Sequence, residues 1–214
     1  MEIGPGNLNL AQDLLAYFSK GTLIDYNPDV EKVYDNLSEL SKRRLEFIVG
    51  DFSSITLQTE YDCVVACEVL EHIENDDEFL GLLVGVLSNR GQLVLSVPSR
   101  MKFWSKHDEI VGHIKRYEKE EIIKMLSKWR LKNINVVSYG FPFINILRWP
   151  RILLAKLQYG KKIHWDQKKQ TQGSGIINAT QWIDLLGIVC NPYTIYPLNM
   201  LSSLFDRYDW SNGY

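Results

Sequence analysis

The chain has 214 residues, of which 45% are hydrophobic, and its formal net charge at pH 7 is −2. This length and composition predict one globular domain with a sizeable core, and the near-neutral charge argues against a general nucleic-acid-binding protein. The three cysteines, Cys63, Cys67 and Cys190, contain no C-x-x-C pair, so we expect reduced thiols in the cytoplasm. No secretory leader and no apolar run of membrane-spanning length is expected.

Strand and helix patterns alternate through the first 140 residues. The expected strands are Met1–Ile3, Thr22–Asp25, Phe47–Asp51, Tyr61–Cys67, Gln92–Val97 and Leu131–Tyr139. The expected helices run from the first glycine turn to about Phe18, onward from Pro28, from Asp76 to Leu87 and from Glu118 to Trp129. This alternation predicts an α/β fold, a mostly parallel sheet with helices on both faces. Tyr61–Cys67 is almost entirely apolar, so we expect it in the interior of the sheet.

The last third of the chain differs in charge. Residues 1–140 carry 16 basic and 22 acidic side chains, whereas residues 141–214 carry 8 and 4. The stretch 141–169 combines seven basic residues with aromatic side chains, which suits either a lid over a substrate or contact with an anionic membrane surface. Further helices are expected near 179–189 and 198–205. We therefore expect a core of residues 1–140 and a helical cap of residues 141–214 in the same domain.

A tight glycine turn joins the first strand to the first helix, in the sequence Glu2-Ile3-Gly4-Pro5-Gly6. Because Gly4 and Gly6 lack a Cβ, the backbone can bend sharply and let a ligand approach. The helix that follows offers unpaired N–H groups to that ligand. Nucleotide-like cofactors are held in this way on doubly wound sheets.

Two acids follow the next two expected strands. Asp25 can accept both hydroxyls of a ribose, and Asp51 can accept from an exocyclic amine while Phe52 covers the ring face. A nicotinamide-binding fold would also place an acid at Asp25, but its fingerprint needs glycine where this chain has Asn9. The pattern therefore favours a different adenosine-containing cofactor.

Together these motifs resemble those of the class I S-adenosylmethionine (SAM)-dependent methyltransferases, over roughly residues 1–140. Glu2, Gly4 and Gly6 match the family's acid-x-Gly-x-Gly-x-Gly motif, and Leu8 replaces its third glycine. Cys67–His72 resembles the "EVLEH" segment of one branch of small-molecule methyltransferases, and Gly112–Tyr117 resembles the "GH-x-R-x-Y" stretch of that branch. The resemblance implies SAM as cofactor, with these binding residues: Glu2, Gly4, Pro5, Gly6, Asp25, Tyr26, Asp51, Phe52, Cys67 and Glu68.

The candidate catalytic residues are His72, His113 and Tyr117. A histidine can deprotonate a substrate hydroxyl near neutral pH. His113 could equally anchor its loop, with Arg116 and Tyr117 capping the next helix, and both interpretations remain open.

Glu68, Glu71 and His72 are spaced i, i+3 and i+4, so on a helical turn they would share one face and could hold a divalent metal. Some ubiquinone-pathway O-methyltransferases and small-RNA 2′-O-methyltransferases use an E-x-x-E-H segment in this way. Most methyltransferases that share "EVLEH" bind no metal, so we expect none here.

The resemblance implies methyl transfer to a small hydroxylated, lipid-linked acceptor, with oxygen favoured as the methylated atom. The alternative is a catalytically weak SAM-binding fragment or pseudoenzyme that serves as a partner subunit. No nucleic-acid partner is expected. We expect the protein in the cytoplasm, with residues 141–169 available for peripheral membrane contact, and its oligomeric state is open.

The ends of the chain depart from the family pattern. Met1 falls within the first strand, and Asp209–Tyr214 resembles the turn that leads into the family's seventh, antiparallel strand. We therefore expect a sheet that lacks the seventh strand and is incomplete near Leu131–Tyr139.

Overall fold

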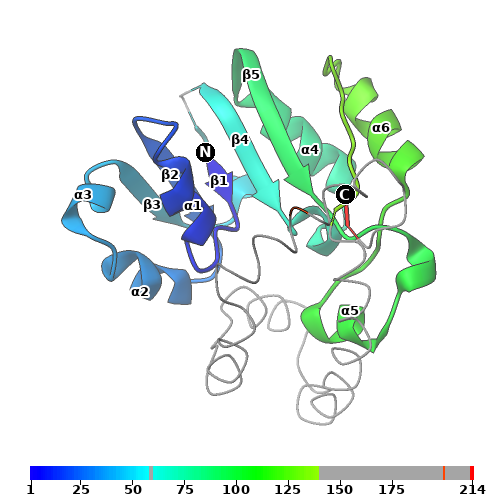
Figure 1. The fold of residues 1–214 in the computed structure, drawn as a ribbon, viewed down its shortest axis with the longest axis horizontal. Coiled ribbons are helices and arrows are strands. Elements are labelled where there is room, and N and C mark those ends of the chain that lie inside the picture. The colour runs from blue at the N-terminus through cyan, green and yellow to red at the C-terminus, as the bar shows by residue number, and fades with distance from the viewer. Residues whose placement is uncertain (58–59, 140–199, 201–212) are drawn as a thin grey trace. The chain divides into compact units, whose positions relative to one another are not determined.

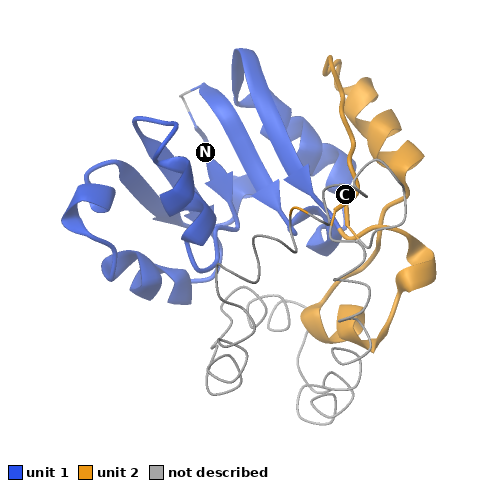
Figure 2. Cartoon of the chain, viewed as in Figure 1, with its two compact units in different colours: residues 1–97, 171–176 blue, residues 98–170, 177–214 orange. Residues whose placement is uncertain are grey.

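The structure is a computed structural model that describes residues 1–57, 60–139, 200 and 213–214. These residues fall into two compact units (Figure 2): the first comprises residues 1–97, and the second begins at Pro98 and includes Gly213 and Tyr214. Apart from residues 200, 213 and 214, the expected cap lies outside the described residues, as does the basic stretch 141–169. The core boundary expected at residue 140 stays a prediction.

The first unit is built on a five-stranded parallel sheet of order β3-β2-β1-β4-β5 (Figure 1). Its strands are β1 Glu2–Ile3, β2 Gly21–Asp25, β3 Leu45–Val49, β4 Tyr61–Cys67 and β5 Leu87–Ser96. The chain winds outward in one direction from β1 through β2 to β3 and in the other from β4 to β5. The strand order therefore reverses between β1 and β4, where parallel sheets form a ligand crevice at their carboxyl ends. The predicted fold class is confirmed, and β4 is an interior strand as expected.

Helices cover both faces of this sheet, with α1 and α4 on opposite sides in Figure 1. They are α1 Asn9–Leu14, α2 Asp29–Asp35, α3 Glu39–Lys42 and α4 Asp76–Gly85, and two single 3₁₀ turns, η1 Phe52–Ser54 and η2 Leu70–His72, follow β3 and β4. A buried apolar cluster joins α1 and α2 to the sheet through Leu8, Ala11, Leu23, Val30, Leu37 and Leu45. In the described part of the chain, no helix is both long and apolar enough to span a bilayer.

Leu8 explains how the glycine turn tolerates a larger residue. It caps α1 in the left-handed conformation, with φ of 59°, and its side chain is fully buried in the apolar cluster. The left-handed region costs a leucine roughly 1–2 kcal/mol, whereas burying its side chain contributes about 2 kcal/mol or more. The third glycine of the family motif is therefore replaced by a residue whose packing offsets its backbone strain.

Several element bounds differ from the sequence-based expectation. β3 begins and ends two residues earlier, because Asp51 caps η1 through a hydrogen bond from the Ser53 amide at 2.9 Å instead of ending the strand. β5 starts at Leu87, because Tyr61 pairs with Leu87 and Cys63 with Gln92, which places residues 88–91 in a bulge. Those four residues, Ser-Asn-Arg-Gly, read as a loop from composition alone.

The second unit contains the 3₁₀ turn η3 Met101–Phe103 and helices α5 Lys106–Val111 and α6 Lys119–Lys128. The sixth strand expected at Leu131–Tyr139 was wrong, since within these described residues only Tyr139 makes a β-bridge. Arg130 and Asn133 have φ of 58° and 55°, so the backbone turns through the left-handed region where the strand should begin.

Gly213 pairs with two segments of the second unit. It forms isolated antiparallel bridges with both Pro98 and Tyr139. Gly213 belongs to the stretch expected to precede a seventh strand, and these bridges place it between the two segments that such a strand would join.

Candidate functional site

A cleft of about 120 Å³ opens at the carboxyl ends of β1 to β4 in the first unit. It brings together six of the predicted cofactor residues, and it also contains His72. Its lining is Ile3, Gly4, Ile24, Asp25, Tyr26, Asn27, Gly50, Asp51, Phe52, Glu68, Val69, His72, Ile73 and Phe79. The cleft lies beside the switch point between β1 and β4, where ligands bind in sheets of this kind.

The glycine turn forms one wall of the cleft. Gly4 and Gly6 have φ of 66° and 51°, which side chains rarely adopt, and the Gly4 amide donates to the Ile24 carbonyl at 2.9 Å. A Cβ on Gly4 would lie only 2.8 Å from Val69 Cγ2. The turn therefore needs glycine at position 4 for two independent reasons, backbone conformation and space.

Asp25 ends β2 with its carboxylate held by the backbone. The amide of Asn27 donates to Oδ1 at 2.9 Å, and the Gly6 amide also hydrogen-bonds the carboxylate. Burial raises the pKa of Asp25, and these two amides act against that shift by favouring the charged form. The carboxylate is thus fixed next to the glycine turn, as recognition of a ribose requires.

Asp51 and Phe52 follow β3 on the next side of the cleft. Asp51 is exposed, and Phe52 is buried with its ring edge-on to Phe79, the two ring centroids being 5.6 Å apart. A solvent-facing carboxylate beside an apolar ring suits a base such as adenine, which needs an acceptor for its amine and a cover for its face.

Glu68 follows β4 in the left-handed conformation, with φ of 54°. Ser96, the last residue of β5, holds it twice: the Ser96 hydroxyl donates to Oε1 at 2.8 Å, and the Glu68 amide donates to the Ser96 carbonyl at 2.9 Å. Because η2 begins only at Leu70, Glu68 does not share a helical turn with Glu71 and His72.

The three residues considered as metal ligands therefore do not lie on one helical turn. Glu68 and His72 line the cleft, whereas the Glu71 side chain is fully buried. Carboxylate and imidazole atoms of Glu71 and His72 lie within 4.8 Å of each other. The shared helical face on which the metal hypothesis rested does not form.

Four predicted cofactor residues, Glu2, Pro5, Gly6 and Cys67, do not line this cleft. Gly6 acts through its bond to Asp25, and the Pro5 carbonyl accepts from the Leu8 amide at 2.9 Å within the turn. Burial raises the pKa of the Cys67 thiol, which makes it a poor nucleophile.

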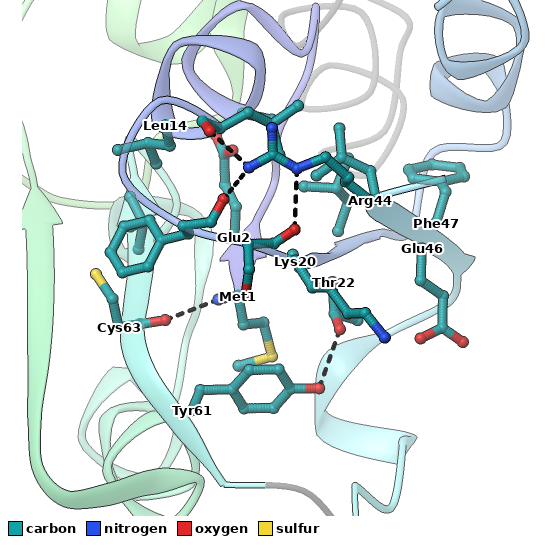
Figure 3. A pocket seen from close by; sticks show the side chains of 18 of the residues that line it. Met1, Glu2, Leu14, Lys20, Thr22, Arg44, Glu46, Phe47, Tyr61 and Cys63 are labelled. Atoms are coloured by element: carbon teal, nitrogen blue, oxygen red, sulfur yellow. Dashed lines mark hydrogen bonds between the residues drawn. The ribbon is translucent and has the colours of Figure 1, made fainter. Parts of the chain in front are cut away.

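Glu2 instead lines a larger cavity of about 800 Å³ at the amino ends of the strands, shown in Figure 3. Its side chain is 6% exposed, and burial raises its pKa to about 7. Nearby, the Met1 amino group donates to the Cys63 carbonyl at 2.7 Å, and Arg44 donates to three carbonyls in the segment that follows α1. The amino ends are not where sheets of this kind bind cofactors, so we assign the chemistry to the smaller cleft.

The other two catalytic candidates, His113 and Tyr117, belong to the second unit. His113 is 11% exposed, and its Nδ1 lies 3.0 Å from Asp108 Oδ1. Tyr117 is fully buried, with Lys115 Nζ 4.4 Å from its ring centroid, and its amide donates to the Pro98 carbonyl at 3.0 Å. Neither Tyr117 nor Arg116 caps α6, whose N-cap is Glu118.

Asp108 is the residue that sequence reasoning missed in this unit. It is fully buried and accepts from Arg116 Nε at 2.8 Å as well as from His113. Burial alone would raise its pKa, but the His113 hydrogen bond and the Arg116 guanidinium hold the pKa of Asp108 well below its usual range. The available signal was the pattern Ser105-x-x-Asp108, a capping box that begins α5.

Comparison with known proteins finds the same fold and a match to a methyltransferase family over the first unit. Residues 1–95 match the family described as "Methyltransferase domain". The mitochondrial ubiquinone biosynthesis O-methyltransferase of Schizosaccharomyces pombe is 34% identical over 103 residues, which are 47% of this chain and 38% of that protein. The chain thus spans well under half of that relative's length.

Two solved structures share the fold at low identity. A candidate methyltransferase of Bacillus halodurans superposes with a TM-score of 0.59 at 16% identity, over 80% of each chain. The magnesium protoporphyrin IX methyltransferase of Synechocystis, which contains bound S-adenosylhomocysteine (SAH), gives a TM-score of 0.50 at 16% identity, over 66% of this chain and 67% of the other. The strand order, the glycine turn and the domain match agree that this chain has the fold of the methyltransferases to which it is similar, with residues 1–95 matching the methyltransferase-domain model.

Proposed function

We propose that this protein binds SAM in the cleft at the carboxyl ends of β1 to β4 and methylates a hydroxyl group of a small acceptor. One observation carries the proposal: the cleft gathers Gly4, Asp25, Asp51 and Phe52 from three different segments of the chain. Each supplies what one part of an adenosylated amino acid needs, and their chain order follows the motifs of the family.

The residues present fit the cofactor. A Cβ on Gly4 would fill the space beside this residue. Because glycine has no Cβ, a ligand can approach the backbone closely there. Asp25, fixed by two backbone amides, would accept the ribose hydroxyls, while Asp51 and Phe52 would hold the adenine. Glu68, held by Ser96 on the far side of the cleft, would face the methionine end.

When bound, SAM supplies a methyl carbon whose bond to sulfur breaks as the bond to the acceptor oxygen forms, with the electron pair staying on sulfur. The protein's contribution is to hold the acceptor in line and to remove its hydroxyl proton. His72 in the cleft and His113 in the second unit are the side chains that we propose for proton removal. Tyr117 stays a prediction as a catalytic residue, and its complete burial favours a packing role.

The acceptor class is supported by the S. pombe relative, whose name identifies it as an O-methyltransferase of ubiquinone biosynthesis. We propose a hydroxylated aromatic acceptor that carries a lipid chain. The basic, aromatic stretch 141–169 suits the contact with a membrane surface that such an acceptor would require.

The test has a binding arm and a transfer arm. Calorimetry with SAM and SAH should give micromolar-range binding, and labelled SAM should transfer its methyl group to a prenylated catechol. The matched acceptor carries an amine in place of the hydroxyl and should accept far less label. Binding without transfer to any hydroxylated acceptor would favour the partner-subunit alternative, and absence of SAM binding would contradict both.

A further inference from the structure

The large cavity at the amino ends of the strands contains a buried acid whose hydrogen-bonding capacity is not used. Glu2 is 6% exposed, and its Oε2 atom has no hydrogen-bond partner among the described residues. The Met1 ammonium lowers the pKa of this acid, but burial outweighs it and raises the pKa to about 7. A buried acceptor without a donor is unfavourable, so a ligand that donates to Oε2 would stabilise it.

Other polar side chains of this cavity, including two cations, are already paired within the protein. Arg44 donates to three carbonyls in the segment that follows α1, as Figure 3 shows. Lys42 Nζ donates to the Asp35 carbonyl at 2.6 Å, and the Tyr34 hydroxyl donates to the Leu45 carbonyl at 2.7 Å. Because these two cations are engaged, the buried lining favours a ligand that brings a donor over one that brings an anion.

The walls of the cavity are apolar and aromatic. α1 and the residues after it contribute Leu14, Leu15 and Phe18, and β3 contributes Phe47, whose ring stacks on Tyr34 with the centroids 5.5 Å apart. The volume of about 800 Å³ lies within the range of roughly 300–1,000 Å³ that is usual for small-molecule sites. Such walls suit the apolar body of a ligand, and aromatic faces also attract a cationic group.

Exposed charged side chains of both signs also line this cavity. The carboxylates are Glu46, Glu60 and Asp62, and the bases are Lys20 and Arg43. The exposed lining therefore has no excess of positive charge that would repel an ammonium group. A ligand carboxylate, in contrast, would approach the buried acid and be repelled by its ionised form.

We propose that this cavity is a second ligand site, for a small molecule that combines an apolar body with a primary amine, and that Glu2 binds the ammonium group. The ammonium donates to Oε2 in a charge-assisted hydrogen bond, and the apolar body packs on the aromatic walls. The cavity lies at the amino ends of the strands and the cofactor cleft at their carboxyl ends, so this inference does not depend on the proposed function.

The test uses phenethylamine as the probe and phenethyl alcohol as its neutral match. The full-length ¹⁵N-labelled protein is titrated at about pH 8, above the pKa of Glu2, with and without excess SAH because the cleft also contains acids. The amine should bind with a Kd of roughly a millimolar or tighter, and the alcohol at least tenfold more weakly.

Amide signals locate the bound probe. Those of Gly21, Thr22 and Leu45, which line the cavity, should shift with the amine, and those of Gly50 and Asp51 in the cleft should stay in place. Excess SAH should leave the affinity for the amine unchanged. SAM binding is measured separately, so its absence would contradict the proposed function and leave this inference standing.

Glu2→Gln keeps the size of the side chain but removes its charge, and it should weaken binding of the amine at least tenfold. The matched control is Glu46→Gln, at an exposed carboxylate of the same cavity, which should bind the amine within about twofold of wild type. Urea unfolding verifies that each variant is folded.

Four results would overturn the inference. They are no binding of the amine, equal affinity for amine and alcohol, wild-type affinity in Glu2→Gln, and shifts confined to Gly50 and Asp51. If Glu2→Gln does not fold, the comparison of amine with alcohol and the location of the shifts in the wild-type protein still decide.

Discussion

Gly4 and Val69 approach each other across the mouth of the cofactor cleft so closely that a Cβ on Gly4 would be 2.8 Å from Val69 Cγ2. Gly4 follows β1 and Val69 follows β4, the two strands that flank the switch point of the sheet. The cleft keeps its width between Gly4 and Val69 because Gly4 has no side chain.

Gly4→Ala should weaken SAM binding at least tenfold and destabilise the fold by about 2 kcal/mol, since it adds both a clash and a left-handed alanine. The double variant with Val69→Ala relieves the clash alone and should recover part of the affinity, with Val69→Ala itself as the control. Calorimetry and urea unfolding measure both effects. Equal affinity of Gly4→Ala and wild type would contradict the close approach of a ligand at this turn.

Asp25→Asn should raise the Kd for SAM about thirtyfold, corresponding to roughly 2 kcal/mol for a lost charge-assisted bond. Asp29→Asn is the matched control, because Asp29 lies on the exposed side of α2, in a surface pair with Lys32, and does not line the cleft. If calorimetry finds the two variants equally tight, Asp25 does not bind the ribose.

The left-handed conformation of Leu8 can be tested by comparing the stabilities of its glycine and alanine variants, whose usual order it should reverse. In an ordinary helix glycine is about 1 kcal/mol less favourable than alanine. Leu8 has a φ of 59°, and this left-handed conformation costs alanine roughly 1–2 kcal/mol of backbone strain that glycine does not carry. Both variants lose the buried side chain and should be destabilised by about 2–5 kcal/mol. We expect Leu8→Gly to be at least as stable as Leu8→Ala in chemical denaturation, and a clearly less stable glycine variant would argue against the left-handed cap.

Glu2 should make the protein less stable as the pH rises. Burial raises its pKa from 4.5 to about 7, so between those values the folded state holds a proton that the unfolded state releases. The contribution of protonated Glu2 to the free energy of unfolding is complete below pH 4.5. It is lost as the pH rises through 7, and the loss amounts to about 3 kcal/mol in all.

Glu2→Gln removes that dependence, so above pH 7 the variant should be the more stable protein, while near pH 4.5 the two should coincide. Glu46→Gln, at an exposed carboxylate of β3 that lines the same cavity, is the control and should follow wild type. Urea unfolding across this range measures the difference. Parallel curves for wild type and Glu2→Gln would mean that Glu2 is solvated.

Much of this site could be predicted because it depends on local signals. Gly4, Asp25 and Asp51 lie at or just after the end of a strand, and alternation of apolar segments gives the sheet. The sequence could not predict which way Glu2 points, because the face on which a strand residue lies depends on its pairing. Glu2 pairs with Leu23 and Val65, and all three line the cavity at the amino ends.

The second unit was harder to predict for the same kind of reason. Leu131–Tyr139 has the alternation of a strand, but Arg130 just before it and Asn133 within it adopt the left-handed conformation. Nothing in their side chains demands that conformation. Asp108 was visible as a helix cap, yet its bonds to Arg116 and His113 follow from how the turn after α5 folds back, which spacing alone does not specify.

The bond between Arg100 and Tyr214 has a consequence for the order in which the chain folds. Arg100 Nε donates to the Tyr214 hydroxyl at 3.4 Å across 114 residues, whereas β1 and β2 pair residues about 20 apart. Closing the longer loop costs about 1.5 kcal/mol more in chain entropy. The sheet of the first unit should therefore assemble early and the contacts of Gly213 and Tyr214 late. Gly213→Ala, whose added Cβ would press on the Tyr139 ring, should speed unfolding and leave the refolding rate nearly unchanged.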